Sequence, residues 1–314
     1  MCKQAMTEYS ENKHLINGLG LVGPRIWFKG LRIVLIKKIR YVDSAPRKIS
    51  PNQAEQSLTG NKKMTNTIII ELLDQMPEYP SEAEWKELFI QVESIANDET
   101  PEAQMTIAKM YKEGLGVLED IEKSISWYTK AAEAGLVEAQ YLLGELYYRY
   151  FYIDENSKQK AAKWTEKAAE NGHVKAQHKL SFLYTYGHGV NKDPKQAIKW
   201  CGKAAEQGNE SAQLELGHQY SYGLSLSKDL LKAAEWYKKA AKQGNTEAQR
   251  SLGELYEGGW GVEQNYPLAY SLFSAAAING CDEGTLFRNR LEQKMSADQI
   301  AEAKVAGVNI PFID

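Results

Sequence analysis

Residues 236–262 read WYKKAAKQGNTEAQRSLGELYEGGWGV, and this stretch decides the fold because its features recur along the chain. An Ala-Gln pair begins at positions 103, 139, 176, 212 and 248, at intervals of 36, 37, 36 and 36 residues. A tyrosine stands eight residues after each of these alanines. Five copies in register predict a protein built from one repeated supersecondary unit.

Each unit is predicted to form two helices, named helix A and helix B below. Helix A runs from the Ala-Gln pair past the tyrosine; in the second unit, Ala139, Leu143 and Leu146 fall on one helical face. In the third unit, Asp193 and Pro194 mark the start of helix B, as a capping side chain followed by a ring fixed at helical φ. We therefore expect an all-α fold, a right-handed α/α superhelical solenoid of about five 36-residue helix-pair repeats with capping helices.

The constant positions of the repeat are explained by packing. Helices that cross closely leave no room for long side chains, so one helix A position holds only small residues: Ala108, Gly144, Ser181, Gly217 and Gly253. An Ala-Ala pair in each helix B has the same role, and a glycine after it suits a left-handed residue that ends the helix. Tryptophans are expected to fill the wider gaps beside them, at Trp127, Trp164, Trp200 and Trp236.

These marks resemble the Sel-1-like repeat family, whose members are relatives of the tetratricopeptide repeats. The close matches are Leu252-Gly253-Glu254-Leu255-Tyr256, Gly259-Trp260-Gly261-Val262 and Trp236-Tyr237-Lys238-Lys239-Ala240-Ala241. The likeness covers roughly residues 101–282. It breaks down where Tyr150 and Tyr152 replace the two loop glycines of the second unit, and where Ser225 replaces one in the fourth. The resemblance implies a scaffold that binds other proteins, in assemblies from protein quality control to bacterial signalling and host interaction.

Four segments are predicted: residues 1–63, a capping region over 64–100, the repeats over 101–282, and capping helices over 283–314. Ser81 and Glu84 form a capping box ahead of an apolar stripe, and Ser296 precedes a last helix over 297–306. Residues 1–63 allow two interpretations. Either Met64 is the natural start and the preceding stretch is an over-long reading frame, or these residues form a basic arm that touches nucleic acid or a membrane.

The overall net charge of −3 hides an asymmetry between the two parts of the sequence. Residues 1–63 carry twelve Lys and Arg against four Asp and Glu, whereas residues 64–314 carry twenty-six against thirty-seven. A body with a net charge of −11 is unsuited to phosphate backbones and favours a basic protein or peptide as partner. Nucleic acid is not expected as a partner, nor a membrane except through residues 1–63. Only three cysteines occur, at 2, 201 and 281, which fits a reducing compartment and a cytoplasmic location.

No catalytic, cofactor-binding or metal-binding residues are predicted, and the chain is not expected to be an enzyme. His173 and His178 are five residues apart, whereas two ligands on one helical face need a spacing of four. The Gly-x-Gly loops lack the Gly-Lys-Ser/Thr continuation of a phosphate-binding loop and follow no strand. They are interpreted as tight turns between helices.

Positions that vary between units are free to contact a partner. Rows of such positions on stacked repeats form a continuous surface, and Tyr, Trp and Arg dominate binding hot spots. The candidate partner-binding residues are Tyr141, Tyr148, Arg149, Tyr152, Phe182, His188, His218, Arg250 and Trp260. Tyr148, Tyr152 and Trp260 are expected to be exposed. The alternative is that these side chains pack on the next repeat.

The sequence thus predicts a non-catalytic adaptor that holds a protein or peptide in a groove lined by helices A. An immunity-type protein that masks a basic toxin, or a signalling adaptor, is a sharper version of this hypothesis. Two alternatives stay open: a hydrolase acting on cell-wall-like substrates, and a membrane-associated scaffold tethered by residues 1–63.

Overall fold

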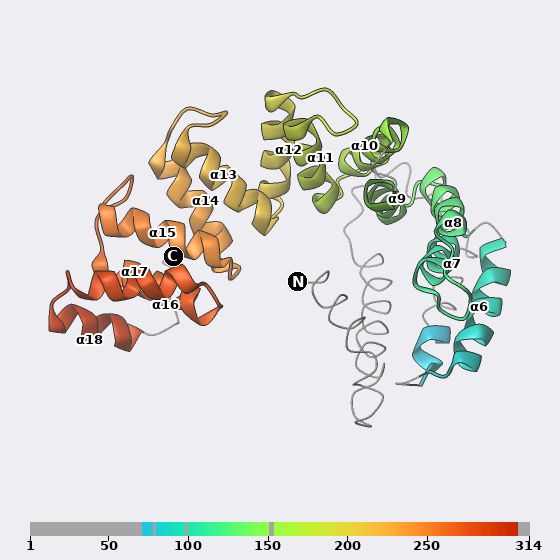
Figure 1. Cartoon of the computed structure of the whole chain (residues 1–314), viewed down its shortest axis with the longest axis horizontal. Coiled ribbons are helices and arrows are strands. Elements are labelled where there is room, and N and C mark those ends of the chain that lie inside the picture. The colour runs from blue at the N-terminus through green and yellow to red at the C-terminus, as the bar shows by residue number, and fades with distance from the viewer. Residues whose placement is uncertain (1–70, 78–79, 98–99, 151–153, 307–314) are drawn as a thin grey trace, which may run out of the picture. The chain divides into compact units, whose positions relative to one another are not determined.

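The computed structural model describes residues 71–77, 80–97, 100–150 and 154–306, so residues 1–63 and Tyr152 lie outside the described part. Every regular element within these ranges is an α-helix, which confirms the all-α solenoid (Figure 1). The helix A and helix B pairs are α7 (Pro101–Glu113) with α8 (Ile121–Glu133), α9 (Val137–Tyr150) with α10 (Glu155–Glu170), α11 (Val174–Tyr186) with α12 (Pro194–Glu206), α13 (Glu210–Tyr222) with α14 (Leu230–Lys242), and α15 (Thr246–Gly258) with α16 (Tyr266–Ile278). Helix α6 (Glu82–Asn97) precedes them, and α17 (Asp282–Glu292) and α18 (Ala297–Ala306) follow.

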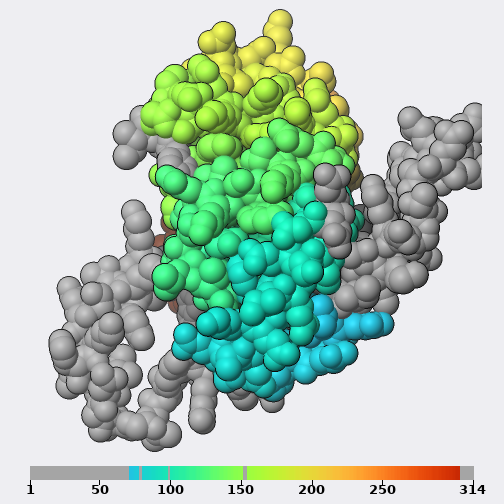
Figure 2. Space-filling model, turned by 90° about the vertical axis from the view of Figure 1, so that its right-hand side faces the viewer, coloured from blue at the N-terminus to red at the C-terminus, as the bar shows by residue number. Residues whose placement is uncertain are grey.

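The chain divides into two compact units, residues 1–140 and 141–314, and the boundary falls inside α9. In the first unit, α6 packs on α7 and α7 packs on α8 (Figure 2). Trp85 and Val92 of α6 are buried in one core with Ile107 and Met110 of α7. The predicted capping box is confirmed, because the Ser81 N–H donates to the Glu84 carboxylate at 2.6 Å and the Glu84 N–H to Ser81 Oγ at 3.3 Å.

In the second unit, each helix from α10 to α16 packs on the next one along the chain, and α18 packs on α16. The small residues of helix A lie where the two helices of a pair cross, as predicted. A Cβ atom at Gly217 would stand 2.4 Å from the buried ring of Tyr237, and one at Gly253 would stand 2.6 Å from Phe273. In the fourth and fifth repeats, the helix A backbone therefore packs directly against a large helix B ring, whereas Gly144 of the second repeat faces the smaller Thr165.

Polar caps fix where the helices begin. The Asp193 carboxylate accepts hydrogen bonds from the backbone N–H groups of Lys195 and Gln196 at the start of α12, which confirms its predicted role. An Asp or Asn caps every other helix B in the same way: Asp120, Asp154, Asp229 and Asn265. The predicted last helix is also capped, because the Gln299 N–H donates to Ser296 Oγ at 3.2 Å and the Ser296 N–H to Gln299 Oε1 at 2.9 Å.

The glutamine of the Ala-Gln pair joins each repeat to the helix before it. The Gln213 Nε2 atom donates to the carbonyl oxygen of Ala205, in the last turn of α12, at 3.0 Å. The same bond recurs eight residues apart in every repeat, from Gln104, Gln140, Gln177 and Gln249. Because these side chains are buried, each amide satisfies a carbonyl at a helix end that water cannot reach.

The second glycine of the loop after helix A approaches the preceding helix B closely. A Cβ atom at Gly189, where φ is +72°, would lie 2.1 Å from the carbonyl oxygen of Lys158 in α10. Gly261 stands in the same way against Leu230 of α14. In the first unit, Gly116 stands against Trp85 of α6, so α6 takes the place of a helix B before the first repeat.

The tryptophans of helix B are buried or half-buried, and each lies under a lysine. Trp164 and Trp200 are buried, whereas Trp127 and Trp236 are half-buried. A lysine three residues later places its Nζ atom 3.7–4.4 Å from the ring centroid, at Lys130, Lys167, Lys203 and Lys239. The lysine stems therefore cover the rings that were expected to fill gaps between helices.

Candidate partner-binding surface

Helices α9, α11, α13 and α15, with the loops after α11 and α15, carry the predicted partner-binding residues that the structure describes, and all of these residues belong to the second unit. Several of these side chains connect one repeat to the next. The Tyr141 ring stacks on His173 with centroids 4.4 Å apart, and His173 also caps α11 by accepting from the Ala176 N–H. Arg250 contacts Glu254 within α15 at 2.6 Å and Glu283 of α17 at 3.1 Å.

Ion pairs and histidine–carboxylate contacts link successive helices A along the unit. Glu145 of α9 pairs with Lys179 of α11 at 3.2 Å. His178 lies 3.4 Å from Glu215 of α13, and His218 lies 3.5 Å from Glu247 of α15. These side chains are partly exposed, so the helix A side presents a row of charged and aromatic groups.

An aromatic cluster lies at the C-terminal end of α11, between the second and third repeats. The ring centroid of Tyr148 lies 6.3 Å from that of Phe182 and 6.1 Å from that of His188. Lys179 Nζ lies 3.5 Å from the Tyr148 ring centroid. Tyr148 is therefore half-buried against the next repeat and not exposed as expected. Phe182 and His188 are half-buried in the same cluster, whereas Arg149 is exposed.

Burial and nearby charges set the protonation of two candidate histidines. Burial lowers the pKa of His188, and the ammonium groups of Lys158, Lys179 and Lys192 lower it further. Burial also lowers the pKa of His218, although Glu247 acts against this effect. Both imidazoles are consequently neutral at neutral pH.

Three exposed rings stand at the ends of α11, α13 and α15, and the sequence predicted only one of them. Trp260 has 56% of its surface exposed, in agreement with the prediction. Tyr186 and Tyr222, which are 53% and 64% exposed, were missed. They occupy one repeat position, ten residues after the alanine of the Ala-Gln pair. The other repeats have Glu113, Arg149 and Gly258 at this position, so the repeat pattern gave no signal for an exposed ring.

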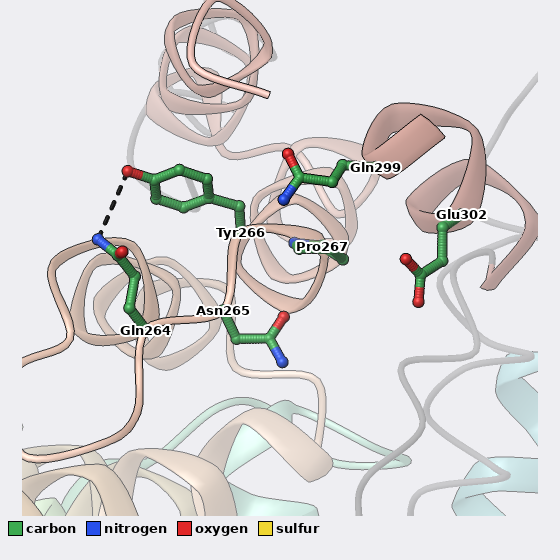
Figure 3. Close-up of a pocket in the computed structure, with 6 residues that line it drawn as sticks. All are labelled: Gln264, Asn265, Tyr266, Pro267, Gln299 and Glu302. Carbon is green, nitrogen blue, oxygen red and sulfur yellow. Dashed lines mark hydrogen bonds between the residues drawn. The ribbon is translucent and has the colours of Figure 1, made fainter. Parts of the chain in front are cut away.

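The remaining reactive groups lie in structural surroundings. Cys201 is buried in α12 and donates to the carbonyl oxygen of Ala212, and burial raises the pKa of its thiol far above the usual range. Within the described ranges, no group of three metal-ligating side chains comes together. A shallow pocket lies between the start of α16 and α18, lined by neutral polar groups, Pro267 and Glu302 (Figure 3). No described helix is long and apolar enough to cross a bilayer.

Comparisons with known proteins place these features in a family. The Sel1 repeat model matches residues 101–136, 137–173, 174–209, 210–245 and 246–281. A Sel1 repeat protein from Oxalobacter formigenes with a known crystal structure is 32% identical in sequence to this chain, with a TM-score of 0.60. The match covers 68% of this chain and 85% of that one. No curated protein matches the chain.

Two further solved structures are less similar. A protective antigen of uropathogenic Escherichia coli strains, which displays an SLR fold, is 26% identical with a TM-score of 0.49, and the match covers 90% of this chain and 66% of that one. An immunity protein from Pseudomonas aeruginosa is 20% identical with a TM-score of 0.41, over 72% of this chain and 84% of that one. These two comparisons carry no functional conclusion.

Proposed function

Because the chain belongs to the Sel1 repeat family and carries five consecutive repeats, we propose that it is a non-catalytic scaffold that binds a partner protein or peptide on the helix A side of its second unit. The observation that carries this proposal is that the side chains of helices A change from repeat to repeat more than those of helices B. Constant positions of the repeat are used in packing and capping, so only the variable positions remain to distinguish partners.

Three of the four helices B of the second unit, α10, α12 and α14, present nearly the same chemistry, whereas α16 has Leu272 and Ala275 in place of the tryptophan and the lysine. Lysines recur at one position of α10, α12 and α14, as Lys167, Lys203 and Lys239, each over a tryptophan. Helices A differ from repeat to repeat, because one position holds Glu145, Phe182, His218 and Glu254 in turn. A surface whose groups change along its length discriminates between partners better than a uniform one.

The nature of the groups supports a protein partner. The helix A side offers tyrosine, tryptophan and arginine side chains held by neighbouring helices, which are the residues that contribute most to interface hot spots. The net charge of −11 over residues 64–314 supports a basic partner through faster and better oriented encounter.

Affinity capture with surface variants tests this function. The full-length chain, Arg149→Glu and Trp260→Ala would be immobilised, and proteins retained from a lysate of the source organism compared by quantitative mass spectrometry. Both residues are exposed on the helix A side. Lys199→Glu, at an exposed position of α12, is the matched control on the helix B side.

We expect one or a few proteins to be retained by the natural chain and by Lys199→Glu but lost from at least one helix A variant. The captured protein should then bind the purified chain in solution. If nothing is retained in stoichiometric amount, or if only the helix B variant loses the partner, the proposed function is wrong.

A further inference from the structure

Two consecutive helices A end in an exposed tyrosine at the same repeat position, and the indole of a tryptophan lies over that position in the next repeat. Tyr186 is the last residue of α11 and Tyr222 is the last residue of α13. In α15 this position is Gly258, and a Cβ atom there would lie 2.4 Å from the indole of Trp260. The indole therefore folds back over the site where the tyrosine stands in the other repeats. We name Tyr186, Tyr222 and Trp260 the aromatic edge.

Neighbouring side chains hold these rings in place. The Phe182 ring lies 4.6 Å from Tyr186 on the preceding helical turn, and the His218 ring lies 5.8 Å from Tyr222 in the same relation. The backbone of Gly258 supports the indole of Trp260. Because the rings are positioned before any partner arrives, binding to them loses little side-chain freedom.

Carboxylates accompany the aromatic edge along the fourth and fifth repeats and α17. Glu247, Glu254 and Glu283 have 52%, 32% and 64% of their side chains exposed. Arg250 supplies one positive charge to Glu254 and Glu283. His218, which faces Glu247, is neutral at neutral pH, so negative charge remains beside the rings.

Aromatic faces next to carboxylates match the chemistry of a guanidinium group, which stacks on rings and forms hydrogen bonds with carboxylates. The chain already uses this contact internally, where the guanidinium of Arg290 lies 4.7 Å from the ring centroid of Phe287. Tyr186 lacks these carboxylates, because its ring lies 5.7 Å from that of His188, where the ammonium groups of Lys158, Lys179 and Lys192 act. We propose that Tyr222 and Trp260 of the aromatic edge bind arginine side chains of an extended segment in the partner protein. The inference rests on the proposed function and adds the place of contact and its chemistry.

The repeat geometry also sets the spacing of those arginines. Helices α13 and α15 are in direct contact, and packed helices lie ~8–10 Å apart. An extended chain rises ~3.3 Å per residue, so about three residues span one repeat. In the polyproline II form of an extended chain, which rises about 3.1 Å per residue, every third side chain also points to the same face. We therefore expect the bound segment to adopt this form, with an arginine at every third position.

Fluorescence anisotropy with synthetic peptides tests the inference on the full-length chain. The probe is a labelled peptide of four Arg-Ser-Gly units, and the comparison peptide has Glu in place of Arg. We expect the arginine peptide to bind, with an affinity that falls as salt is added, and the glutamate peptide to bind at least tenfold more weakly. Tyr222→Ala and Trp260→Ala should each weaken binding about tenfold.

Two further variants separate the contribution of the aromatic ring from that of the hydroxyl group and from the loss of any exposed apolar side chain. Tyr222→Phe keeps the aromatic face and should bind the peptide within about twofold of the natural chain, because cation–π contact needs the ring and not the hydroxyl. Leu231→Ala removes a similarly exposed apolar side chain, 58% exposed, from α14 and should change nothing. Circular dichroism melts would show that all variants are folded.

The inference is overturned if the arginine peptide does not bind, if the glutamate peptide binds as well, or if the ring variants bind the peptide like the natural chain. The capture experiment above remains independent of this result. A captured protein that depends on Arg149 but not on Tyr222 or Trp260 would uphold the proposed function and refute the aromatic edge as its contact site.

Discussion

Gly189→Ala should destabilise the junction between the second and third repeats more than any other glycine-to-alanine change in the second unit. Two separate costs combine at this position. Alanine at a φ of +72° is strained by ~1–2 kcal/mol, because its Cβ approaches the following carbonyl. Its Cβ would also lie 2.1 Å from the Lys158 carbonyl oxygen and 2.4 Å from the carbonyl carbon.

The second cost is large because backbone must move. Lys158 is in the first turn of α10, where its N–H donates to the carbonyl oxygen of Asp154 and where the Asp154 side chain caps the helix. The loop would have to withdraw by about 1 Å to reach an ordinary contact distance, and overpacking of this kind costs ~1–3 kcal/mol. The two costs give a total of ~2–5 kcal/mol.

Two other glycines of the same unit separate these costs. Gly208 has a φ of +88° but no atom within 4 Å of a Cβ, so Gly208→Ala should cost only the strain of ~1–2 kcal/mol. Gly202 lies inside α12 with open space around it, so Gly202→Ala should stabilise by ~0.5–1 kcal/mol through helix propensity.

Urea unfolding followed by circular dichroism, together with native-state hydrogen exchange of α10 and α11, would measure the three effects. Hydrogen exchange is needed because repeat arrays can unfold in segments. If Gly189→Ala costs no more than Gly208→Ala, the loop does not pack on α10 as described.

Three further predictions concern buried groups. Trp200→Ala should lower the free energy of unfolding by ~3–5 kcal/mol, measured by urea unfolding, because the ring is 6% exposed and leaves a cavity. Burial acts to raise the pKa of Glu257, but hydrogen bonds from Lys294 and Arg290 outweigh it and hold that pKa below its ordinary value. The stabilisation from these two hydrogen bonds should therefore be complete above the unfolded pKa of about 4.3 and be lost as pH falls through the lower folded pKa. Its loss should appear as faster amide hydrogen exchange in α17. Glu257→Gln should show this faster exchange at every pH. In the folded chain, iodoacetamide should modify the partly exposed Cys281 and leave the buried Cys201 unmodified, as detected by mass spectrometry. Equal modification of the two cysteines would contradict the burial of Cys201 in α12.

The fold could be predicted because its determinants are local and repeated five times. Asp193 before Pro194 specifies a helix start wherever it occurs, and a glycine at a left-handed turn specifies a helix end. The hydrogen bond from Gln213 to the Ala205 carbonyl was not predicted, although the Ala-Gln pair is present in all five repeats. Periodicity locates a buried glutamine but does not say to which carbonyl its amide points.

The candidate site was predicted less well, because exposure depends on the neighbouring repeat. Tyr148 resembles a surface tyrosine in its own helix, yet Phe182 and His188 of the next repeat cover it. Tyr222 occupies the repeat position held by Arg149 in the second repeat and by Gly258 in the fifth. Because the residue type at this position differs between repeats, the repeat pattern did not predict an exposed ring there. Partner binding by the nine predicted residues stays a prediction.

The glutamine contact also bears on how such a chain lengthens during evolution. The donor is in the first turn of one repeat and its acceptor is in the last turn of the repeat before, as for Gln249 and the Ala241 carbonyl. A duplication that copies a whole unit, from helix A to the end of helix B, therefore brings one new donor and one new acceptor together. An insertion that copies only part of a unit, such as helix B alone, leaves a buried carbonyl unpaired, at a cost of ~1–3 kcal/mol. Selection against that cost keeps the copied length near 36 residues, while the exposed positions of each new copy are free to diverge.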